Sequence, residues 1–180
     1  MKSLRGQLVF FWVLLLGMCA ALAVVMFTLY RSSAGAQVAA GRAATEQSCR
    51  AIAARYAKSI AAPAPPRPEV DLLRVLLQLV LIEAPHVEGG VWHAVDGPLA
   101  YAYPTYEGSG VKRDVPAAEQ PLIAQLAQLA ARTRQPQTDV VRGSREALIV
   151  SACPLPAPAD DLAAWTCLLY TSDAADEGLG

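Results

Sequence analysis

The sequence predicts an α+β domain that follows an N-terminal membrane helix, and three observations support this. Residues 8–30 form an apolar run without a charge. Residues 69–84 and 119–135 carry apolar side chains at helical spacing, while shorter segments rich in valine and aromatic residues surround them. The resulting order of helix, helix, strand, strand, helix, strand, strand is typical of an antiparallel sheet with helices packed on it.

The apolar run of residues 8–30 is expected to be a retained transmembrane helix. As a helix it would span roughly 34 Å, which is enough for a hydrocarbon core of about 30 Å. A cleaved signal peptide is the alternative, because Lys2 and Arg5 precede the run and Ala34-Gly35-Ala36 resembles a cleavage site. Signal peptides have apolar cores of about 7 to 15 residues, so the longer run favours a retained anchor.

Basic residues predict the orientation of this anchor. Lys2 and Arg5 lie before the run, and Arg31 follows it directly. The balance of positive charge favours residues 1–7 in the cytoplasm. We therefore expect a single-pass protein of the bacterial inner membrane, with residues 31–166 forming a periplasmic domain.

The end of the chain is expected to be foreign to the protein. The segment CLLYTSDAADE, which begins at Cys167, resembles the translation of a transposon end and adapter used in sequencing libraries. We therefore predict that residues 167–180 are an adapter-derived artefact and that the natural protein continues past about Thr166. A strand that begins near Leu162 would then be cut by this segment.

Charge and cysteine content narrow the functional classes. The formal net charge of −1 does not suggest a nucleic-acid partner. Cys49 and Cys153 are the two cysteines that lie outside the apolar run and the adapter-like segment, so they are candidates for a disulfide in an oxidising compartment. Closing a loop of about 100 residues could stabilise the fold by up to ~4.7 kcal/mol. Two buried free thiols are the alternative.

The segment after the anchor is expected to continue as a long juxtamembrane helix. Residues 31–41 contain no proline, and a helical apolar stripe follows them. The stripe consists of Cys49, Ile52, Ala53, Tyr56 and Ile60. A narrow apolar stripe on a projecting helix is more stable when paired, so we predict a homodimer through residues 45–60. The prolines of residues 63–68 then favour an extended linker.

The next elements are a core helix and a strand pair. The helix of residues 69–84 should bury a wide face, made of Leu72, Leu73, Leu76, Leu77, Val80 and Leu81. Strands are predicted for residues 87–95 and 99–103, because Asp96-Gly97-Pro98 between them is a turn signal. Residues 105–113 contain two glycines and should form a loop.

The last elements are a second core helix and a second strand pair. The helix should begin near Glu119 to Pro121 and end at Gln135-Pro136, with a buried stripe of Leu122, Ile123, Leu126, Leu129 and Ala130. Strands are predicted for residues 138–142 and 146–153, joined around Gly143-Ser144.

Aromatic residues give the best candidate for a ligand site. They are Trp92, Tyr101, Tyr103 and Tyr106, and small-molecule pockets are typically apolar and aromatic. Sheet core or dimer surface is the alternative role. A joint metal site of His86, His93 and Asp96 would need a bulge at Gly89-Gly90. No metal, other cofactor or catalytic residue is therefore expected in this fragment.

The segments CRAIAARYA, VEGGVWHA, AYAYPTYEG, PAAEQPLI and EALIVSACPL resemble the PAS-like or Cache-like sensing region of bacterial sensor histidine kinases. The resemblance implies a dimeric, membrane-anchored receptor of a two-component system that senses an unknown small molecule. The ATP-dependent kinase core, and through it the response regulator as partner, would belong to the missing part. Input domains of chemoreceptors or diguanylate cyclases, and an anchored periplasmic interaction module, are the alternatives.

Overall fold

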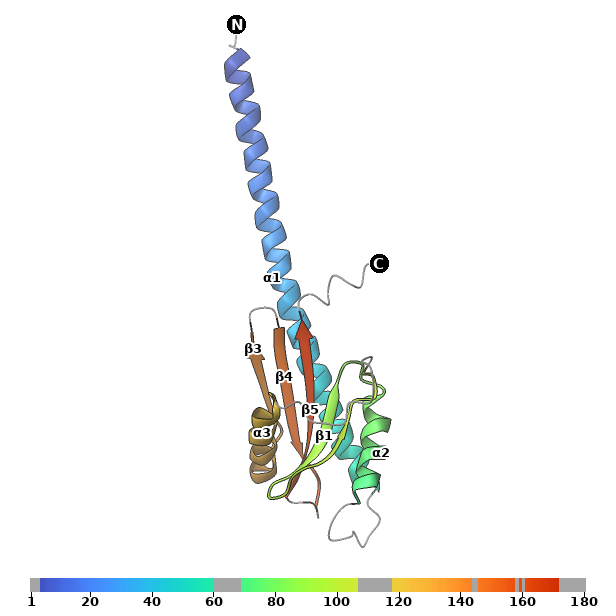
Figure 1. The fold of residues 1–180 in the computed structure, drawn as a ribbon. Helices are drawn as coiled ribbons and strands as arrows, with labels where there is room; N and C mark the ends of the chain where they lie inside the picture. Colours follow the sequence, from blue (N-terminus) through green and yellow to red (C-terminus); the bar gives the residue numbers. More distant parts are fainter. Residues whose placement is uncertain are drawn as a thin grey trace. The chain divides into compact units, whose positions relative to one another are not determined.

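Helix α1 (Leu4–Ser59) begins the computed structural model and is continuous (Figure 1). The structure describes residues 4–59, 69–106, 118–143, 146–157, 159 and 161–171. The predicted continuity between the anchor and the juxtamembrane helix is confirmed. The proline-rich linker, most of the loop of residues 105–113, Ser144 and the end of the tail lie outside the described residues.

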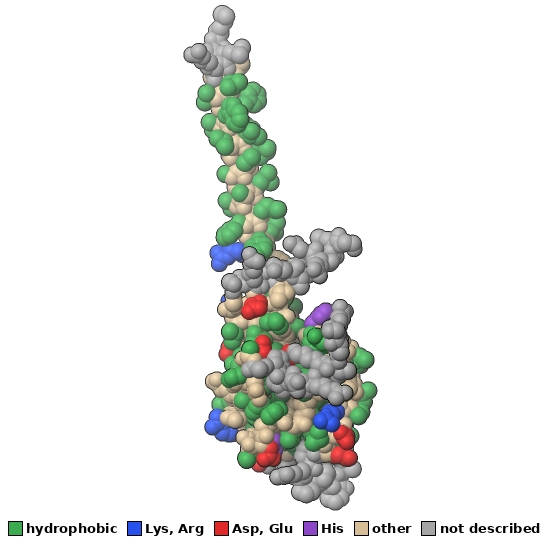
Figure 2. Space-filling model, in the orientation of Figure 1, with side chains coloured by type: hydrophobic (Ala, Val, Ile, Leu, Met, Phe, Trp, Pro, Cys, Tyr) green, Lys and Arg blue, Asp and Glu red, His purple; other side chains and the backbone are tan. Residues whose placement is uncertain are grey.

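The chain divides into two compact units, Met1–Gln37 and Val38–Gly180. In the first unit, apolar side chains are exposed along the described part of α1 (Figure 2). They include Phe11, Leu16 and Met26. A long helix whose apolar side chains are exposed is typical of a membrane span. By length and composition, this helix could span a membrane.

The second unit contains a five-stranded antiparallel sheet, in the order β2-β1-β5-β4-β3. The strands are β1 (Glu88–His93), β2 (Gly97–Ala102), β3 (Gln137–Arg142), β4 (Glu146–Pro154) and β5 (Leu162–Thr171). The sheet and its flanking helices confirm the α+β class, and both predicted strand pairs are present.

Strand β5 is the central strand, and it is longer than the sequence predicted. It pairs with β1 on one side and with β4 on the other, up to Thr171 opposite Glu146. Cys167 is buried and opposes Glu88 and Val150. The first residues of the adapter-like segment therefore complete the strand, because they are apolar and meet a long partner strand. Their origin at the DNA level stays a prediction.

Helices cover both faces of the sheet and create two cores. Helices α1 and α2 (Val70–Leu81) pack on one face, where the core includes Ile52, Leu77 and Val91. Helix α3 (Gln120–Thr133) packs on the other face, where Ile123 and Trp165 are fully buried. Successive β5 residues point to opposite faces, so this strand contributes to both cores.

The structure corrects the buried faces of both core helices. On α2, Leu73, Leu76, Leu77 and Leu81 are buried, whereas Leu72 is 43% exposed. On α3, the buried residues are Ile123, Leu126, Ala127, Ala130 and Ala131, so the two outer leucines of the predicted stripe are only partly covered. Helix α3 ends before the predicted position, because Arg134 adopts a left-handed conformation with φ of 54°.

The apolar stripe of the juxtamembrane helix is buried within its own chain. Cys49 and Ile52 are completely buried and Tyr56 nearly so, all against the sheet and α2. The prediction that this stripe pairs two copies is therefore wrong for the folded domain, since its side chains already have intramolecular partners. A homodimer through another surface stays a prediction.

Candidate functional site

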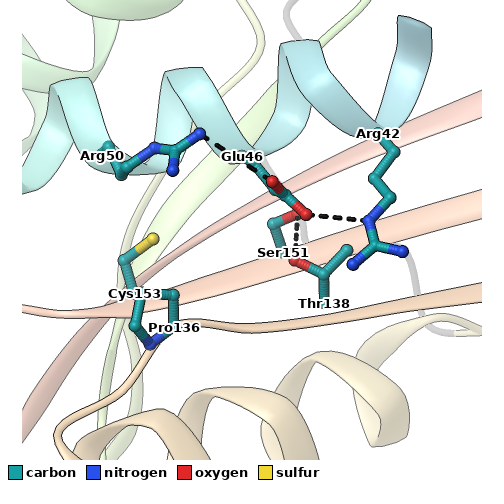
Figure 3. Close-up of a pocket in the computed structure, with 7 residues that line it drawn as sticks. All are labelled: Arg42, Glu46, Arg50, Pro136, Thr138, Ser151 and Cys153. Carbon is teal, nitrogen blue, oxygen red and sulfur yellow. Dashed lines mark hydrogen bonds and ion pairs between the residues drawn. The ribbon is translucent and has the colours of Figure 1, made fainter. Parts of the chain in front are cut away.

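A polar cavity lies where α1 crosses strands β3 and β4 (Figure 3). Its volume is about 150 Å³. The lining residues are Arg42, Glu46 and Arg50 from α1, Pro136 and Thr138 at the start of β3, and Ser151 and Cys153 from β4. The cavity therefore combines two cations, one carboxylate, two hydroxyl groups and one thiol.

Helical spacing puts the charged groups in one row along α1. Residues four apart lie on the same face of a helix, so Arg42, Glu46 and Arg50 follow one another. The Arg42 Nε lies 2.8 Å from Glu46 Oε1, whereas the nearest Arg50 nitrogen lies 3.8 Å from Glu46 Oε2. The hydrogen bond from Arg42 is the main cause that lowers the pKa of Glu46. The row keeps one net positive charge, which favours an anion in the cavity.

A chain of hydroxyl groups connects the cavity to the helix–sheet interface. The hydroxyl oxygens of Thr138 and Ser151 are 3.1 Å apart, and Ser151 donates a hydrogen bond of 3.0 Å to Thr45 Oγ1. Thr166 donates a hydrogen bond of 2.8 Å to the Thr45 backbone oxygen from the neighbouring strand. Thr45 is completely buried, so these bonds are shielded from water and fix the position of α1 on the sheet.

The two candidate disulfide cysteines lie together at this interface as free thiols. Cys49 and Cys153 are close enough for each thiol to shift the pKa of the other, and the Cys49 sulfur lies 3.6 Å from the Ala164 carbonyl oxygen. Burial raises the pKa of the Cys49 thiol. Contact with Cys49 and the nearby charge of Arg50 lower the pKa of the Cys153 thiol. The disulfide itself stays a prediction, because the structure contains the reduced pair.

Two of the predicted aromatic site residues lie on the α3 face of the sheet. Trp92 is 7% exposed and belongs to the core beneath α3. Tyr101 stacks on Trp165 at a ring distance of 5.9 Å and donates a hydrogen bond to the buried carboxylate of Glu88. Burial, and then this bond to Glu88, raise the pKa of Tyr101. Trp92 therefore packs in this core, and Tyr101 is partly buried against it.

The other two aromatic residues form a separate pair. The rings of Tyr103 and Tyr106 are 5.4 Å apart, and the Tyr103 hydroxyl lies 3.3 Å from the His86 carbonyl oxygen. Neither Tyr103 nor Tyr106 lines the polar cavity. The four aromatics are thus divided between two environments, and a ligand-binding role for them stays a prediction.

The two histidines have separate structural positions. His93 Nδ1 accepts a hydrogen bond from the Asp96 backbone nitrogen at 3.0 Å and helps to form the turn between β1 and β2. His86 has a φ of 63° and lies before β1. The register of the β1–β2 pair shifts between Val91 and Trp92, not at the two glycines. Among the described residues, no three metal-ligating side chains come together.

Sequence reasoning missed the cavity and its arginines. One wall of the cavity could have been predicted from the sequence. Arg42, Glu46 and Arg50 are charged residues spaced by four, so they share one face of a helix. The opposite wall depends on how β3 and β4 pair beneath the helix, with Thr138 opposite Ser151. That register involves contacts between distant segments, so local patterns did not predict it.

Comparisons with known proteins do not assign a family. No protein-family model matches the chain, and no curated protein matches it.

Proposed function

We propose that the chain is the membrane-anchored, extracytoplasmic sensing part of a sensor histidine kinase, and that the polar cavity is its ligand site. The position of the cavity supports this most strongly. Arg42, Glu46 and Arg50 belong to the same continuous helix that carries the apolar segment. A ligand that contacts these residues would act directly on the helix leading to the membrane.

The chemistry of the cavity favours a small anion such as a carboxylate or a phosphate. Arg42 and Arg50 together carry more positive charge than Glu46 neutralises. Guanidinium groups bind carboxylates and phosphates through paired, charge-assisted hydrogen bonds. A cavity of about 150 Å³ is smaller than pockets for drug-sized ligands, which reach roughly 300–1,000 Å³. The ligand class is therefore a small oxyanion.

Binding would change the contacts between α1 and the sheet. The Arg50–Glu46 distance of 3.8 Å makes this the weaker of the two ion pairs, so Arg50 is the side chain that can turn toward a ligand. Helix shifts of about 1–2 Å are one form of allosteric transition. In this proposal a PAS-like or Cache-like fold senses the anion, and the output would reach a response regulator through a kinase core. The antiparallel sheet with flanking helices supports that fold assignment at the level of class.

Titration of the full chain in detergent with succinate, and separately with inorganic phosphate, tests the ligand site. We expect one of the two probes to bind. Arg50→Gln should weaken that binding at least roughly tenfold, the effect of losing one charge-assisted hydrogen bond. Arg55→Gln is the matched control, because Arg55 is exposed on the same helix and does not line the cavity. Binding of neither probe, or equal effects of the two variants, would remove the site.

Long-read sequencing of unamplified genomic DNA tests the receptor assignment. We expect the adapter-like codons to be absent after Thr166, and the reading frame to continue into a second membrane span and a kinase core. A chemoreceptor or cyclase domain there would keep the sensing role and change the output. A stop codon soon after Thr166 would contradict the receptor assignment.

An anchored interaction module is the second candidate function, and one feature of α2 favours it. Leu72, Val75, Leu79 and Ile82 form an apolar row and are each at least 43% exposed. Rows of exposed apolar side chains are typical of protein contact surfaces. A stop codon soon after Thr166 together with a pairing surface on α2 would support this function.

A further inference from the structure

The two thiols of the helix–sheet interface, Cys49 and Cys153, differ in their access to the cavity. Cys153 lines the cavity, and its sulfur points toward α1 on the side of Arg50 (Figure 3). Cys49 lies behind it and is completely buried against the carbonyl oxygens of Ser151 and Ala164. A small molecule in the cavity can therefore meet Cys153, whereas Cys49 does not line the cavity and is completely buried.

The charges around the cavity favour a thiolate on Cys153. Arg50 and Glu46 both face the cavity from α1, and Arg42 neutralises Glu46 through its 2.8 Å contact. Arg50 thus remains as the cation next to the thiol. Thiolates react with oxidants and thiols do not, so a cysteine beside a cation in an accessible cavity is the reactive type.

We propose that Cys153 is an oxidant-reactive site for small hydroperoxides and that Cys49 is its resolving cysteine, so that oxidation links α1 to β4. This reactivity does not depend on anion binding in the cavity. The cavity has a volume of about 150 Å³, which is large enough to admit hydrogen peroxide.

The reaction consists of two balanced steps. The Cys153 thiolate attacks one oxygen of hydrogen peroxide, the O–O bond breaks, and the products are Cys153 sulfenic acid and hydroxide. Cys49 then gives up its proton as its sulfur attacks the sulfenic sulfur, the S–O bond breaks, and the hydroxyl group leaves with that proton as water while the disulfide forms. Hydroxide takes up the proton that Cys153 lost earlier. Overall, two thiols and one peroxide give one disulfide and two waters.

The direct test treats the reduced full chain in detergent with stoichiometric hydrogen peroxide, followed by alkylation and non-reducing mass spectrometry. Trypsin and endoproteinase Asp-N separate the cysteines, because Arg50 follows Cys49 and Asp160 lies between Cys153 and Cys167. We expect one linked pair, Cys49 with Cys153, and an unlinked Cys167. Cys167 is the internal control, since it is buried in the core on the other face of the sheet. Both thiols still alkylatable after treatment would overturn the proposal.

Single variants distinguish the two roles. In Cys49→Ala the sulfenic acid has no resolving partner, so dimedone should label Cys153. In Cys153→Ala dimedone should leave Cys49 unlabelled. Labelling of Cys49 instead would overturn the assignment.

Because either variant can fail to fold, the rate of peroxide-driven linkage in proteins that keep both cysteines provides a second measurement. Arg50→Gln should slow peroxide-driven linkage roughly threefold to tenfold, since a smaller fraction of Cys153 is then thiolate. Arg55→Gln should leave the rate unchanged, and equal rates in all three proteins would contradict the role of Arg50.

Discussion

At the scale of residues, two adjacent glycines let β1 accept bulky groups on both faces of the sheet. A methyl group on Gly89 would lie 2.8 Å from the Trp165 carbonyl oxygen and 3.2 Å from Leu81 of helix α2. A methyl group on Gly90 would overlap the Ala100 carbonyl oxygen and lie 2.7 Å from the Trp165 indole nitrogen. The glycines thus serve close packing, since glycine in a strand often marks a close approach of other groups.

Gly90→Ala should destabilise the domain by about 2–4 kcal/mol, because the backbone of β2 would have to move away from β1. Urea unfolding of the full chain in detergent, followed by tryptophan fluorescence, measures the change. Gly35→Ala is the control, since the same methyl group there meets no atom within 4 Å. A loss below about 0.5 kcal/mol for Gly90→Ala would show that the strands can adjust.

At the scale of elements, helix α2 has two apolar faces and the sheet covers only one of them. Leu73 and Leu77 are completely buried, whereas Val75 and Leu79 are each 53% exposed. The exposed row of Leu72, Val75, Leu79 and Ile82 has alternating steps of three and four residues, the seam of a coiled coil. Such a seam matches a second copy of itself. If two copies share one membrane, their high effective concentration would favour this pairing.

We therefore expect the homodimer to form through α2. In a Cys19→Ser background, Leu79→Cys should give a disulfide-linked dimer in membranes, because seam positions of parallel helices face each other. Arg74→Cys should not, since Arg74 is exposed on a different side of the helix. Equal crosslinking of both variants, or no crosslinking at Leu79 and at Val75→Cys, would exclude this dimer.

At the scale of the whole molecule, one helix belongs to both compact units. The first unit ends at Gln37, within the continuous helix α1, and the second unit begins with Val38. The apolar part of α1 exposes its side chains, whereas the part from Thr45 onward buries a stripe against the sheet. The environment of the helix therefore changes from one suited to lipid to one suited to a folded domain.

The predicted orientation can be tested with a reporter fused after Thr171, a position that preserves the central strand β5. Alkaline phosphatase at this position should be active in the periplasm, and green fluorescent protein there should stay dark when exported unfolded. The reverse pattern would put the domain in the cytoplasm. Release of a soluble product that begins near Gln37 would show that Ala34-Gly35-Ala36 is cleaved, contrary to the retained anchor.

Local patterns in the sequence determined the existence and type of the main elements. Helical spacing identified the stripe of α1 and the approximate bounds of α3, and valine-rich runs identified the strands, because these periods reflect the geometry of one element. The same patterns could not assign the partner of each stripe. The stripe of α1 at Cys49 and Ile52 is equally suited to a second helix and to a sheet, and only the fold shows that the sheet covers it.

The tertiary structure alone decided which distant residues meet. Cys49 contacts Cys153 because α1 crosses β4 at that point, and Arg50 faces the same cavity because it lies on the same side of the helix. The predicted aromatic site residues lie in different environments. Tyr101 in β2 stacks on Trp165, whereas Tyr103 and Tyr106, which follow β2, pair with each other. Sequence determines periodicity within an element, whereas a site between elements depends on strand order and register, which are set by the packing of segments about 100 residues apart.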